Sequence, residues 1–224
     1  GANENIMEEV FERMLWLARS NYEMHFEHNS ALSERVIFPV SSVEARGIED
    51  ARFVRFEEED GRETYYATYT AYDGMHILTQ FLETEDFCRF KVHTLNGRYA
   101  QSKGMALFPR KIDGRYAMIS RVDGEHLYLM YSENLHFWDT AERLEMPMYP
   151  WEVLQVGNCG SPIETEAGWL MITHGVGVMR FYSIGVVLLD RDDPSKVIGK
   201  LTQPLLVPEP EDLSGQIPNV VYSC

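Results

Sequence analysis

A short phrase of sequence occurs three times in this chain, and it constrains the fold more than any other feature. Each copy has a turn glycine, an aromatic residue and a short apolar strand, and the copies begin at Gly61, Gly114 and Gly168. The three glycines lie about 53 residues apart, a spacing typical of propeller blades and other repeat architectures. A propeller arranges its strands radially around a central channel. We therefore expect the polar residues that end these strands to line one central funnel.

Short strands separated by turn signals fill the chain from about residue 36 onward, which predicts an all-β fold. Asp-Gly pairs such as Asp60-Gly61 and Asp113-Gly114 favour hairpins between these strands. Three clear repeats and a partial one do not close a ring comfortably. The chain also stops within residues 219–224, which have the pattern of a strand that is beginning. We therefore expect this sequence to be part of a longer protein.

Residues 4–19 are predicted to form one amphipathic helix. Their apolar side chains recur at steps of three and four residues, at Ile6, Val10, Met14 and Leu17. We expect this helix to pack against a larger domain, and we divide the chain into a helical extension, residues 1–34, and a β domain, residues 35–224. The apolar partner of the helix is either this β domain or a neighbouring copy, so a homo-oligomer is one alternative.

The net charge of −15 argues against binding to DNA or RNA, which requires a basic surface. The three cysteines are far apart, without a CxxC pair, and the histidines are scattered, so no disulfide, metal site or bound cofactor is predicted. No apolar run approaches about 20 residues, so no membrane span is predicted. No signal peptide is recognisable, and we predict a cytoplasmic location. A neutral or polar ligand fits this composition.

Four segments that can carry chemistry follow one another along the chain. They are GIEDAR at 47–52, YTAYDG at 69–74, the segment 103–116, and GWLMITHG at 168–175. In this order they resemble the motifs of glycoside hydrolase family 130, the β-mannoside phosphorylases and related mannosidases. The resemblance extends over nearly everything from residue 35 to 224. It implies an inverting enzyme acting on β-linked mannosides and a five-bladed β-propeller whose last blade, or part of it, lies beyond Cys224.

The resemblance implies that Asp73, which closes the YTAYDG segment, is the general acid. Cleavage of a glycosidic bond requires a proton on the leaving oxygen, and a carboxylic acid facing the bond can deliver it. In this family the proton is thought to pass through a sugar hydroxyl. The alternative is purely structural, because Asp73-Gly74 is also a favoured hairpin pair.

Substrate-binding residues follow from the same motifs. Asp50 and Arg52 match the family segment that holds sugar hydroxyls, although Ala51 stands where the family usually has proline. A structural ion pair beside a turn is the alternative for these two side chains. Tyr72 and Asn158 complete the predicted substrate-binding set.

Phosphorolysis requires a cationic pocket, because inorganic phosphate carries about two negative charges that must be offset when it loses water. The resemblance and the charges of the chain point to Lys103, Arg121 and His174 as phosphate-binding residues. Inorganic phosphate is then a co-substrate rather than a cofactor. A hydrogen-bonded core histidine is the alternative for His174.

Two departures from the phosphorylases favour water as the nucleophile. Gln155 stands where they usually carry lysine before a glycine turn, and Glu164 lies near a second position where they tend to have lysine. A carboxylate there, Glu164 or Glu166, is the predicted general base of an inverting hydrolase. Phosphate and water therefore both remain open as nucleophiles. A carbohydrate-binding propeller without turnover is the alternative from another class, and the presence of Asp73 argues against it.

Overall fold

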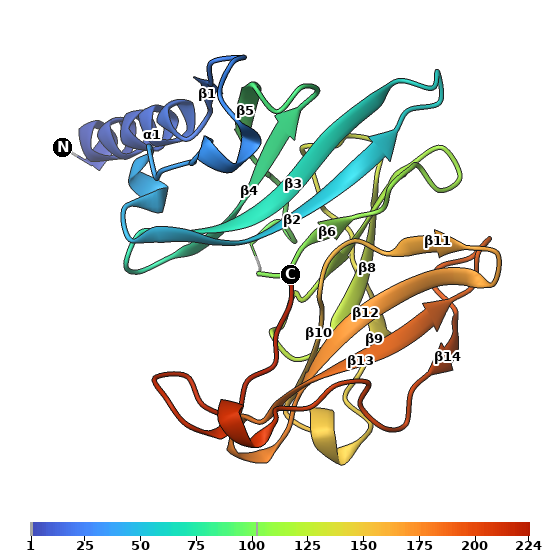
Figure 1. Cartoon of the computed structure of the whole chain (residues 1–224). Coiled ribbons are helices and arrows are strands. Elements are labelled where there is room, and N and C mark those ends of the chain that lie inside the picture. Colours follow the sequence, from blue (N-terminus) through green and yellow to red (C-terminus); the bar gives the residue numbers. More distant parts are fainter. Residues whose placement is uncertain (1, 102) are drawn as a thin grey trace.

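The computed structural model describes residues 2–101 and 103–224, and it contains one long helix followed by three antiparallel sheets (Figure 1). The helix is α1 (Ala2–Arg19). The first sheet has the order β1-β5-β4-β3-β2 and contains β1 (Tyr22–His25), β2 (Gly47–Glu57), β3 (Glu63–Tyr72), β4 (Ile77–Thr84) and β5 (Arg89–Thr94). The second sheet has the order of β6 (Ala106–Leu107), β7 (Tyr116–Ser120), β8 (Leu127–Ser132) and β9 (Glu142–Glu145).

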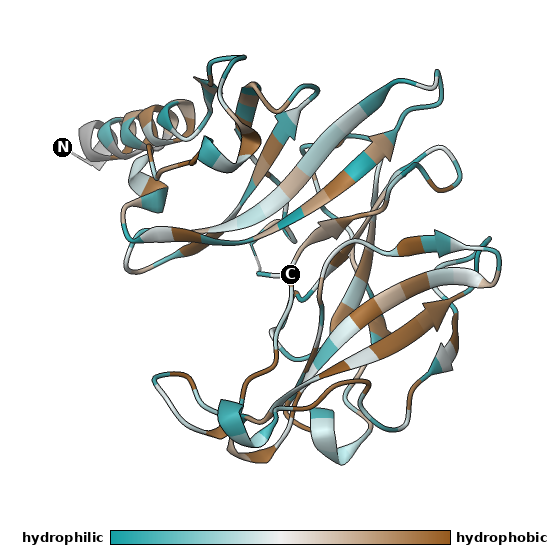
Figure 2. Ribbon diagram, viewed as in Figure 1, coloured by the Kyte–Doolittle hydropathy of each residue, from teal (hydrophilic) through white to brown (hydrophobic). Residues whose placement is uncertain are grey.

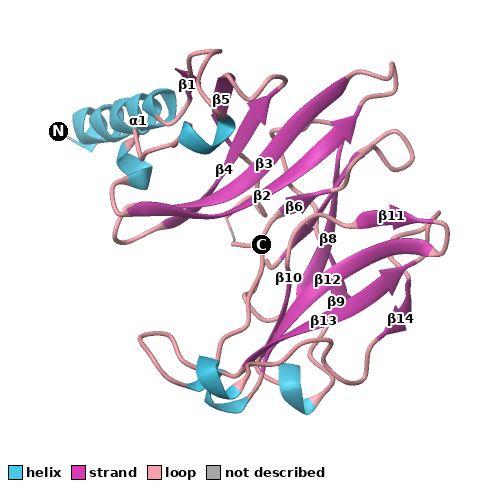
Figure 3. Cartoon of the chain, viewed as in Figure 1, coloured by secondary structure: helices cyan, strands magenta, loops and turns pink. Residues whose placement is uncertain are grey.

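The third sheet has the order of β10 (Gln155–Asn158), β12 (Gly168–Val176), β13 (Tyr182–Leu189) and β14 (Val197–Lys200), and β11 (Ile163–Thr165) also pairs with β12. Short 3-10 helices lie in the connections (Figure 3): η1 (Leu32–Glu34), η2 (Ser42–Glu44), η3 (Pro150–Glu152), η4 (Val178–Arg180) and η5 (Pro210–Leu213). Strands therefore dominate the chain after α1.

The sequence repeat corresponds to the second strand from one edge of each sheet. Strands β3, β7 and β12 begin at or just after the repeat glycines. The backbone φ is +80° at Gly61, +73° at Gly114 and +136° at Gly168, conformations that glycine adopts without the steric cost that a Cβ brings. The prediction of an all-β fold preceded by one helix is confirmed. The number of five blades stays a prediction.

Apolar side chains between successive sheets form the core. One cluster joins Phe56 of the first sheet to Met118 of the second, and another joins Ile119 of the second to Trp169 and Val187 of the third. Figure 2 shows apolar colouring along much of β13, and apolar positions that alternate with paler or polar ones on β12. Burial of this surface provides the main force that holds neighbouring sheets together. The last residues of the chain return between the first and third sheets (Figure 1).

Helix α1 forms as predicted, but most of the apolar residues that predicted it do not pack against the β domain of the same chain. Ile6, Val10 and Met14 are all at least half exposed. The helix contacts the β structure through its C-terminal end, where Trp16 packs against the core cluster of the first sheet and Ser20 is fully buried. Strand β1 directly follows and pairs with β5, so residues 22–25 belong to the first sheet. The domain division at residue 34 stays a prediction.

A buried carboxylate ties the start of β2 to the first sheet. Glu44 is fully buried and accepts hydrogen bonds from Tyr22 Oη at 2.9 Å and from Tyr69 Oη at 2.5 Å. The amides of Val40 and Ser41 donate to the same carboxylate, each at 2.9 Å. Burial alone raises the pKa of Glu44, but these hydrogen bonds outweigh burial and hold the pKa below its ordinary value. Glu44 is therefore an ionised structural residue.

Replacement of this carboxylate is expected to destabilise the first sheet. Glu44→Gln turns one acceptor oxygen into a donor that faces existing donors, and we expect a loss of about 2 kcal/mol in the free energy of unfolding. Chemical denaturation measures this change. Glu133→Gln, at an exposed turn position, is the matched control and is expected to stay within about 0.5 kcal/mol of the wild type. Equal stability of the two variants would contradict the structural role of Glu44.

Candidate active site

Arg52 reaches the centre of the molecule because β2 contains a bulge. The pairing of β2 with β3 shifts register between Glu49 and Arg52, and Asp50 within the bulge has a φ of +58°. A bulge redirects the side chains that follow it, and aspartate is among the residues that tolerate the left-handed region. As a result, the Arg52 side chain is 4% exposed.

Tyr222 joins Asp50 to Arg52. Arg52 Nη2 donates to Tyr222 Oη at 2.8 Å, and the tyrosine hydroxyl donates to Asp50 Oδ2 at 3.2 Å. Burial raises the pKa of Tyr222 to about 12, so its hydroxyl keeps the proton that this arrangement requires. The Tyr222 ring also lies edge-on to His174, with the ring centroids 5.0 Å apart. The C-terminal segment thus contributes directly to the site.

Arg121 and His174 meet on the other side of this group. Arg121 Nη1 lies 3.3 Å from His174 Nε2. Arginine can only donate, so Nε2 accepts and the imidazole proton is on Nδ1, which faces Cys159 Sγ at 3.7 Å. Burial, with the charges of Arg121 and Arg52, lowers the pKa of His174 to about 3. The imidazole is therefore neutral at physiological pH.

Gly157 makes the approach of these side chains possible. It is paired with His174 across β10 and β12, and a Cβ added to Gly157 would lie 2.4 Å from His174 Cε1 and 3.2 Å from Arg121 Nη1. Any larger residue would displace the imidazole. Gln155 lies two residues before Gly157 on the same strand. Its amide oxygen accepts from Arg121 Nη1, and its amide nitrogen lies 3.2 Å from the Gly124 carbonyl.

Asn158 and Lys103 lie at the edge of this group. Asn158 is 1% exposed and donates to the Gly160 carbonyl at 3.3 Å, whereas its Oδ1 has no hydrogen-bond partner among the described residues. Gly104 packs beside it, with room for a Cβ 3.7 Å from Asn158 Oδ1. Lys103 forms an ion pair with Glu49. We call Asp50, Arg52, Arg121, Asn158, His174 and Tyr222 the central cluster.

Asp73 is placed in the hairpin between β3 and β4. Its Oδ1 accepts from the amides of Met75 at 2.7 Å and His76 at 2.6 Å, and its Oδ2 lies 3.1 Å from His76 Nδ1. These hydrogen bonds lower the pKa of Asp73 to about 2, so the carboxylate is ionised at neutral pH. Tyr72 donates to the Gly74 carbonyl at 2.9 Å in the same hairpin. These contacts are the ones expected if Asp73 only stabilises the hairpin turn.

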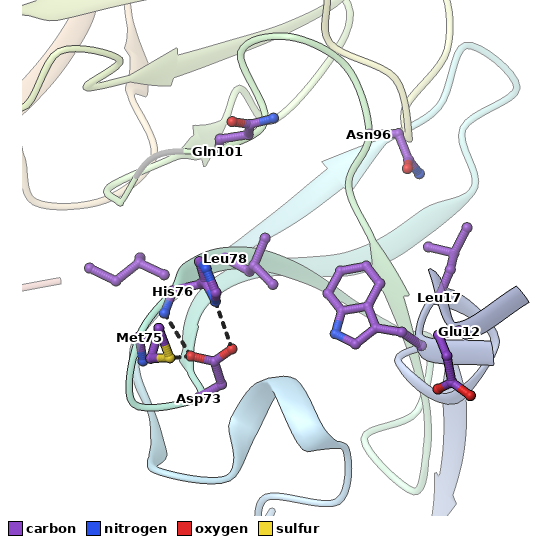
Figure 4. A pocket seen from close by; sticks show the side chains of 10 residues that line it. Glu12, Leu17, Asp73, Met75, His76, Leu78, Asn96 and Gln101 are labelled. Atoms are coloured by element: carbon purple, nitrogen blue, oxygen red, sulfur yellow. Dashed lines mark hydrogen bonds and ion pairs between the residues drawn. The ribbon is translucent and has the colours of Figure 1, made fainter. Parts of the chain in front are cut away.

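The same carboxylate also lines an open cleft with a volume of about 1080 Å³ (Figure 4). The β3–β4 hairpin forms one wall, and Glu12 and Leu17 of α1 lie on another. A ligand in this cleft would therefore contact Asp73. An ionised carboxylate has no proton to donate. Asp73 can therefore act as a general acid only if a ligand in the cleft changes its hydrogen bonds and raises its pKa.

The structure does not bring Glu164 to the central cluster. Glu164 is opposite Trp169 in the β11–β12 pairing, five residues along β12 from His174, which corresponds to roughly 17 Å. Arg110 holds it in a two-pronged ion pair, at 2.7 and 2.9 Å, and this contact lowers the pKa of Glu164. Glu166 lies at the exposed turn that follows.

A sequence model of one protein family, described as beta-1,4-mannooligosaccharide phosphorylase, matches residues 7–224. The chain belongs to glycoside hydrolase family 130. The match includes all of the residues of the central cluster as well as Asp73 and Glu164. Within the residues that the structure describes, no three His, Cys, Asp or Glu side chains are grouped as metal ligands, and no helix is long and apolar enough to span a membrane.

Curated relatives of this family 130 chain are phosphorylases. It is 34% identical to a 1,2-beta-oligomannan phosphorylase of Thermoanaerobacter sp. over 86% of the chain and 64% of that protein. It is 35% identical to a beta-1,2-mannobiose phosphorylase of the same organism over 81% of the chain and 59% of that protein. The chain thus spans about three fifths of the length of these relatives.

A solved structure supports the same family 130 assignment. The beta-1,2-mannobiose phosphorylase of Listeria innocua, in complex with beta-1,2-mannobiose, superposes with a TM-score of 0.71 and 26% identity. The superposition covers 82% of this chain and 52% of that chain. The mostly β architecture described above is therefore the architecture of this part of the family 130 fold.

Two residues that shape the central cluster, Tyr222 and Gly157, were not predicted from the sequence. Tyr222 was only part of an expected strand, and the phenolic hydroxyl at its end was the available signal. The need for glycine at position 157 follows from the clearance of the His174 ring, which is visible only when β10 and β12 are paired.

The neutral imidazole predicts how stability depends on pH. The folded pKa of His174, about 3, lies below the unfolded value of about 6.5. Below pH 6.5 the unfolded state gains a proton that the folded state does not, so the free energy of unfolding falls by about 1.4 kcal/mol per pH unit. From pH 6.5 to pH 5 this contribution is about 2 kcal/mol. His174→Gln is expected to lose it, and denaturation curves of both proteins across this range measure the difference. Parallel pH profiles would contradict a buried neutral His174.

Proposed function

We propose that this chain forms the catalytic part of an inverting β-mannoside phosphorylase. The enzyme would transfer a mannosyl group from the end of a β-linked mannooligosaccharide to inorganic phosphate, giving α-mannose 1-phosphate and a shortened sugar. The observation that carries this proposal is the convergence of two guanidinium groups, the buried Arg52 and the half-buried Arg121, beside the neutral imidazole of His174. The phosphorylase activity of the curated relatives supports it.

An anion would relieve the electrostatic cost of the central cluster. Burial and then the charge of Arg52 lower the pKa of Arg121, which reflects two like charges held in a poorly solvated space. The Nε of Arg52 is buried without a hydrogen-bond partner among the described residues. A phosphate dianion between the two guanidinium groups would supply both the opposite charge and acceptor oxygens. Lys103, the third predicted phosphate-binding residue, would contribute only if phosphate drew it away from its ion pair with Glu49.

The surroundings of Glu164 favour phosphate over water as the nucleophile. A general base must face a water molecule across the sugar ring from the acid. The Glu164 carboxylate, on β11, is instead held by Arg110 and by Arg191, at 3.2 Å, beside the start of β12 and away from His174. Gln155, in place of the cation expected there, orients Arg121 through a hydrogen bond and leaves that guanidinium able to bind an anion.

The reaction then has a balanced description. A phosphate oxygen attacks C1 of the mannosyl group, the bond between C1 and the leaving oxygen breaks, and that oxygen receives one proton. Attack from the face opposite the leaving group converts a β-mannoside into an α-phosphate. We assign the proton to Asp73, directly or through a sugar hydroxyl. Its pKa must rise when a sugar fills the cleft and displaces water and the His76 contact.

Sugar hydroxyls would bind at the rim of the central cluster. The unpartnered Asn158 Oδ1 can accept a hydroxyl proton, and Asp50 Oδ2 offers a second acceptor beside Tyr222. The three sheets are, in this proposal, three successive blades of a five-bladed propeller around the cluster. The cytoplasmic location and the homo-oligomer stay predictions.

Product analysis tests the proposed function. The protein that contains this chain is incubated with β-1,2- and β-1,4-linked mannooligosaccharides, with and without inorganic phosphate. We expect mannose 1-phosphate only when phosphate is present. Glu164→Gln is the matched variant for the nucleophile, and we expect it to keep the phosphorolysis rate within about three-fold because Glu164 is not near the reacting atoms. Free mannose formed without phosphate, and lost in Glu164→Gln, would establish a hydrolase with Glu164 as base.

Two substitutions separate the two roles of Asp73. Asp73→Asn keeps an oxygen that accepts from the Met75 and His76 amides but cannot deliver a proton. Asp73→Ala removes both functions. If Asp73 is the acid, both variants lose at least about 100-fold in kcat, while only the alanine variant loses thermal stability. Retention of activity in Asp73→Asn would show that the residue serves the hairpin alone.

A further inference from the structure

We propose that the cleft between α1 and the β3–β4 hairpin binds the leaving-side sugars of the substrate, and that Trp16 of α1 selects oligosaccharides longer than a disaccharide. This inference rests on the proposed function, because it uses Asp73 to define the leaving side. The names of the relatives include both an oligomannan phosphorylase and mannobiose phosphorylases. These names differ in the length of the sugar substrate.

The size of the cleft accommodates more than one sugar ring. Its volume of about 1080 Å³ slightly exceeds that of ordinary ligand pockets, which measure roughly 300–1,000 Å³. Asp73 and His76 lie on one wall, and Glu12 and Leu17 of α1 lie on another (Figure 4). A first leaving-side sugar would therefore occupy the hairpin wall, and only a further sugar would extend to the helix.

Trp16 is built into the cleft wall and not merely exposed on a helix. It is partly buried and packs against the core cluster of the first sheet. The chain following it is fixed, because Ser20 Oγ donates to the Trp16 carbonyl at 2.8 Å and Gln80 donates to the Ser20 carbonyl at 3.1 Å. A large, rigid aromatic ring held in this way offers an apolar surface against which the carbon face of a sugar ring can pack at low entropic cost.

Polar side chains of the connection after β5 complement this aromatic surface. Asn96 and Gln101 line the cleft opposite the hairpin (Figure 4). Asn96 is oriented by the hydrogen bond from its amide nitrogen to the Thr94 carbonyl, at 3.0 Å. Amide groups both donate and accept, so they match the hydroxyl groups of a neutral sugar.

The charge of the cleft also fits a neutral sugar. Glu12 and Asp73 are carboxylates on its walls, and they would repel an anion such as phosphate. The guanidinium groups lie in the central cluster instead. Phosphate and the leaving-side sugars are thereby assigned to separate places, on opposite sides of the bond that breaks.

Chain-length dependence tests this assignment. We would measure phosphorolysis of mannobiose and mannotetraose by the wild type, Trp16→Ala, Trp16→Phe and Met14→Ala. Met14 lies on the same helix, is 65% exposed and does not line the cleft, so it is the matched control. For Trp16→Ala we expect kcat/KM to fall about ten-fold with mannotetraose and less than two-fold with mannobiose, since one lost ring contact removes about one factor of ten. Trp16→Phe should keep most of the mannotetraose activity, and Met14→Ala all of it.

Equal losses with both sugars in Trp16→Ala, in a variant that melts at the wild-type temperature, would overturn the inference. So would an unchanged ratio in all variants. If the wild type forms no mannose 1-phosphate, the proposed function fails, and calorimetric titration with the same sugars then decides the question of the cleft. Tighter binding of mannotetraose than of mannobiose, lost in Trp16→Ala and kept in Met14→Ala, supports the cleft assignment on its own. Equal binding of the two sugars overturns it.

Discussion

The site depends on keeping two guanidinium groups and an imidazole together in a space with little water. Arg52 comes from the first sheet, Arg121 from the end of the second, and His174 from the third. Two like charges in such a space repel, so the fold must hold them in place. The neutral state of His174 lets its Nε2 accept from Arg121, and Tyr222 accepts from Arg52. These neutral acceptors restrain the cations without cancelling their charge, which a carboxylate partner would do.

Two local irregularities in the strands make room for this cluster. Because Gly157 has no side chain, the imidazole of His174 can lie across β10. The bulge at Asp50 turns the Arg52 side chain inward. Both features weaken a strand locally, since glycine and bulges reduce regular pairing. The apolar clusters between the sheets offset this cost, with Phe56 and Trp169 fully buried. Packing far from the site is therefore what permits irregular backbone at the site.

The sequence predicted the elements that follow from local rules. The repeat glycines, Gly61, Gly114 and Gly168, located the equivalent strands, because a turn glycine and an apolar strand are local signals. Strand β1 was not predicted, because its four residues form a strand only through their pairing with β5. The apolar spacing of α1 predicted the helix but not which of its residues contact the sheet. That contact depends on where Trp16 and Ser20 meet the first sheet, which is a tertiary property.

The same distinction holds for the site. Residue type and motif order pointed to Arg52, Arg121 and His174. In the structure, Arg52 follows the bulge of β2, Arg121 directly follows β7, and His174 lies near the end of β12. For Asp73 and Glu164, residue type was equally suggestive, but their surroundings differ. Glu164 has two arginine partners, whereas the partners of Asp73 are two backbone amides and one imidazole at an open cleft. An arginine pair fixes a carboxylate in its ionised state, whereas an imidazole at the edge of a cleft can be displaced by a ligand. Asp73 is therefore the better candidate for proton transfer. Glu164 would have to break two arginine ion pairs before it could be protonated, whereas Asp73 would have to lose its contact with one imidazole.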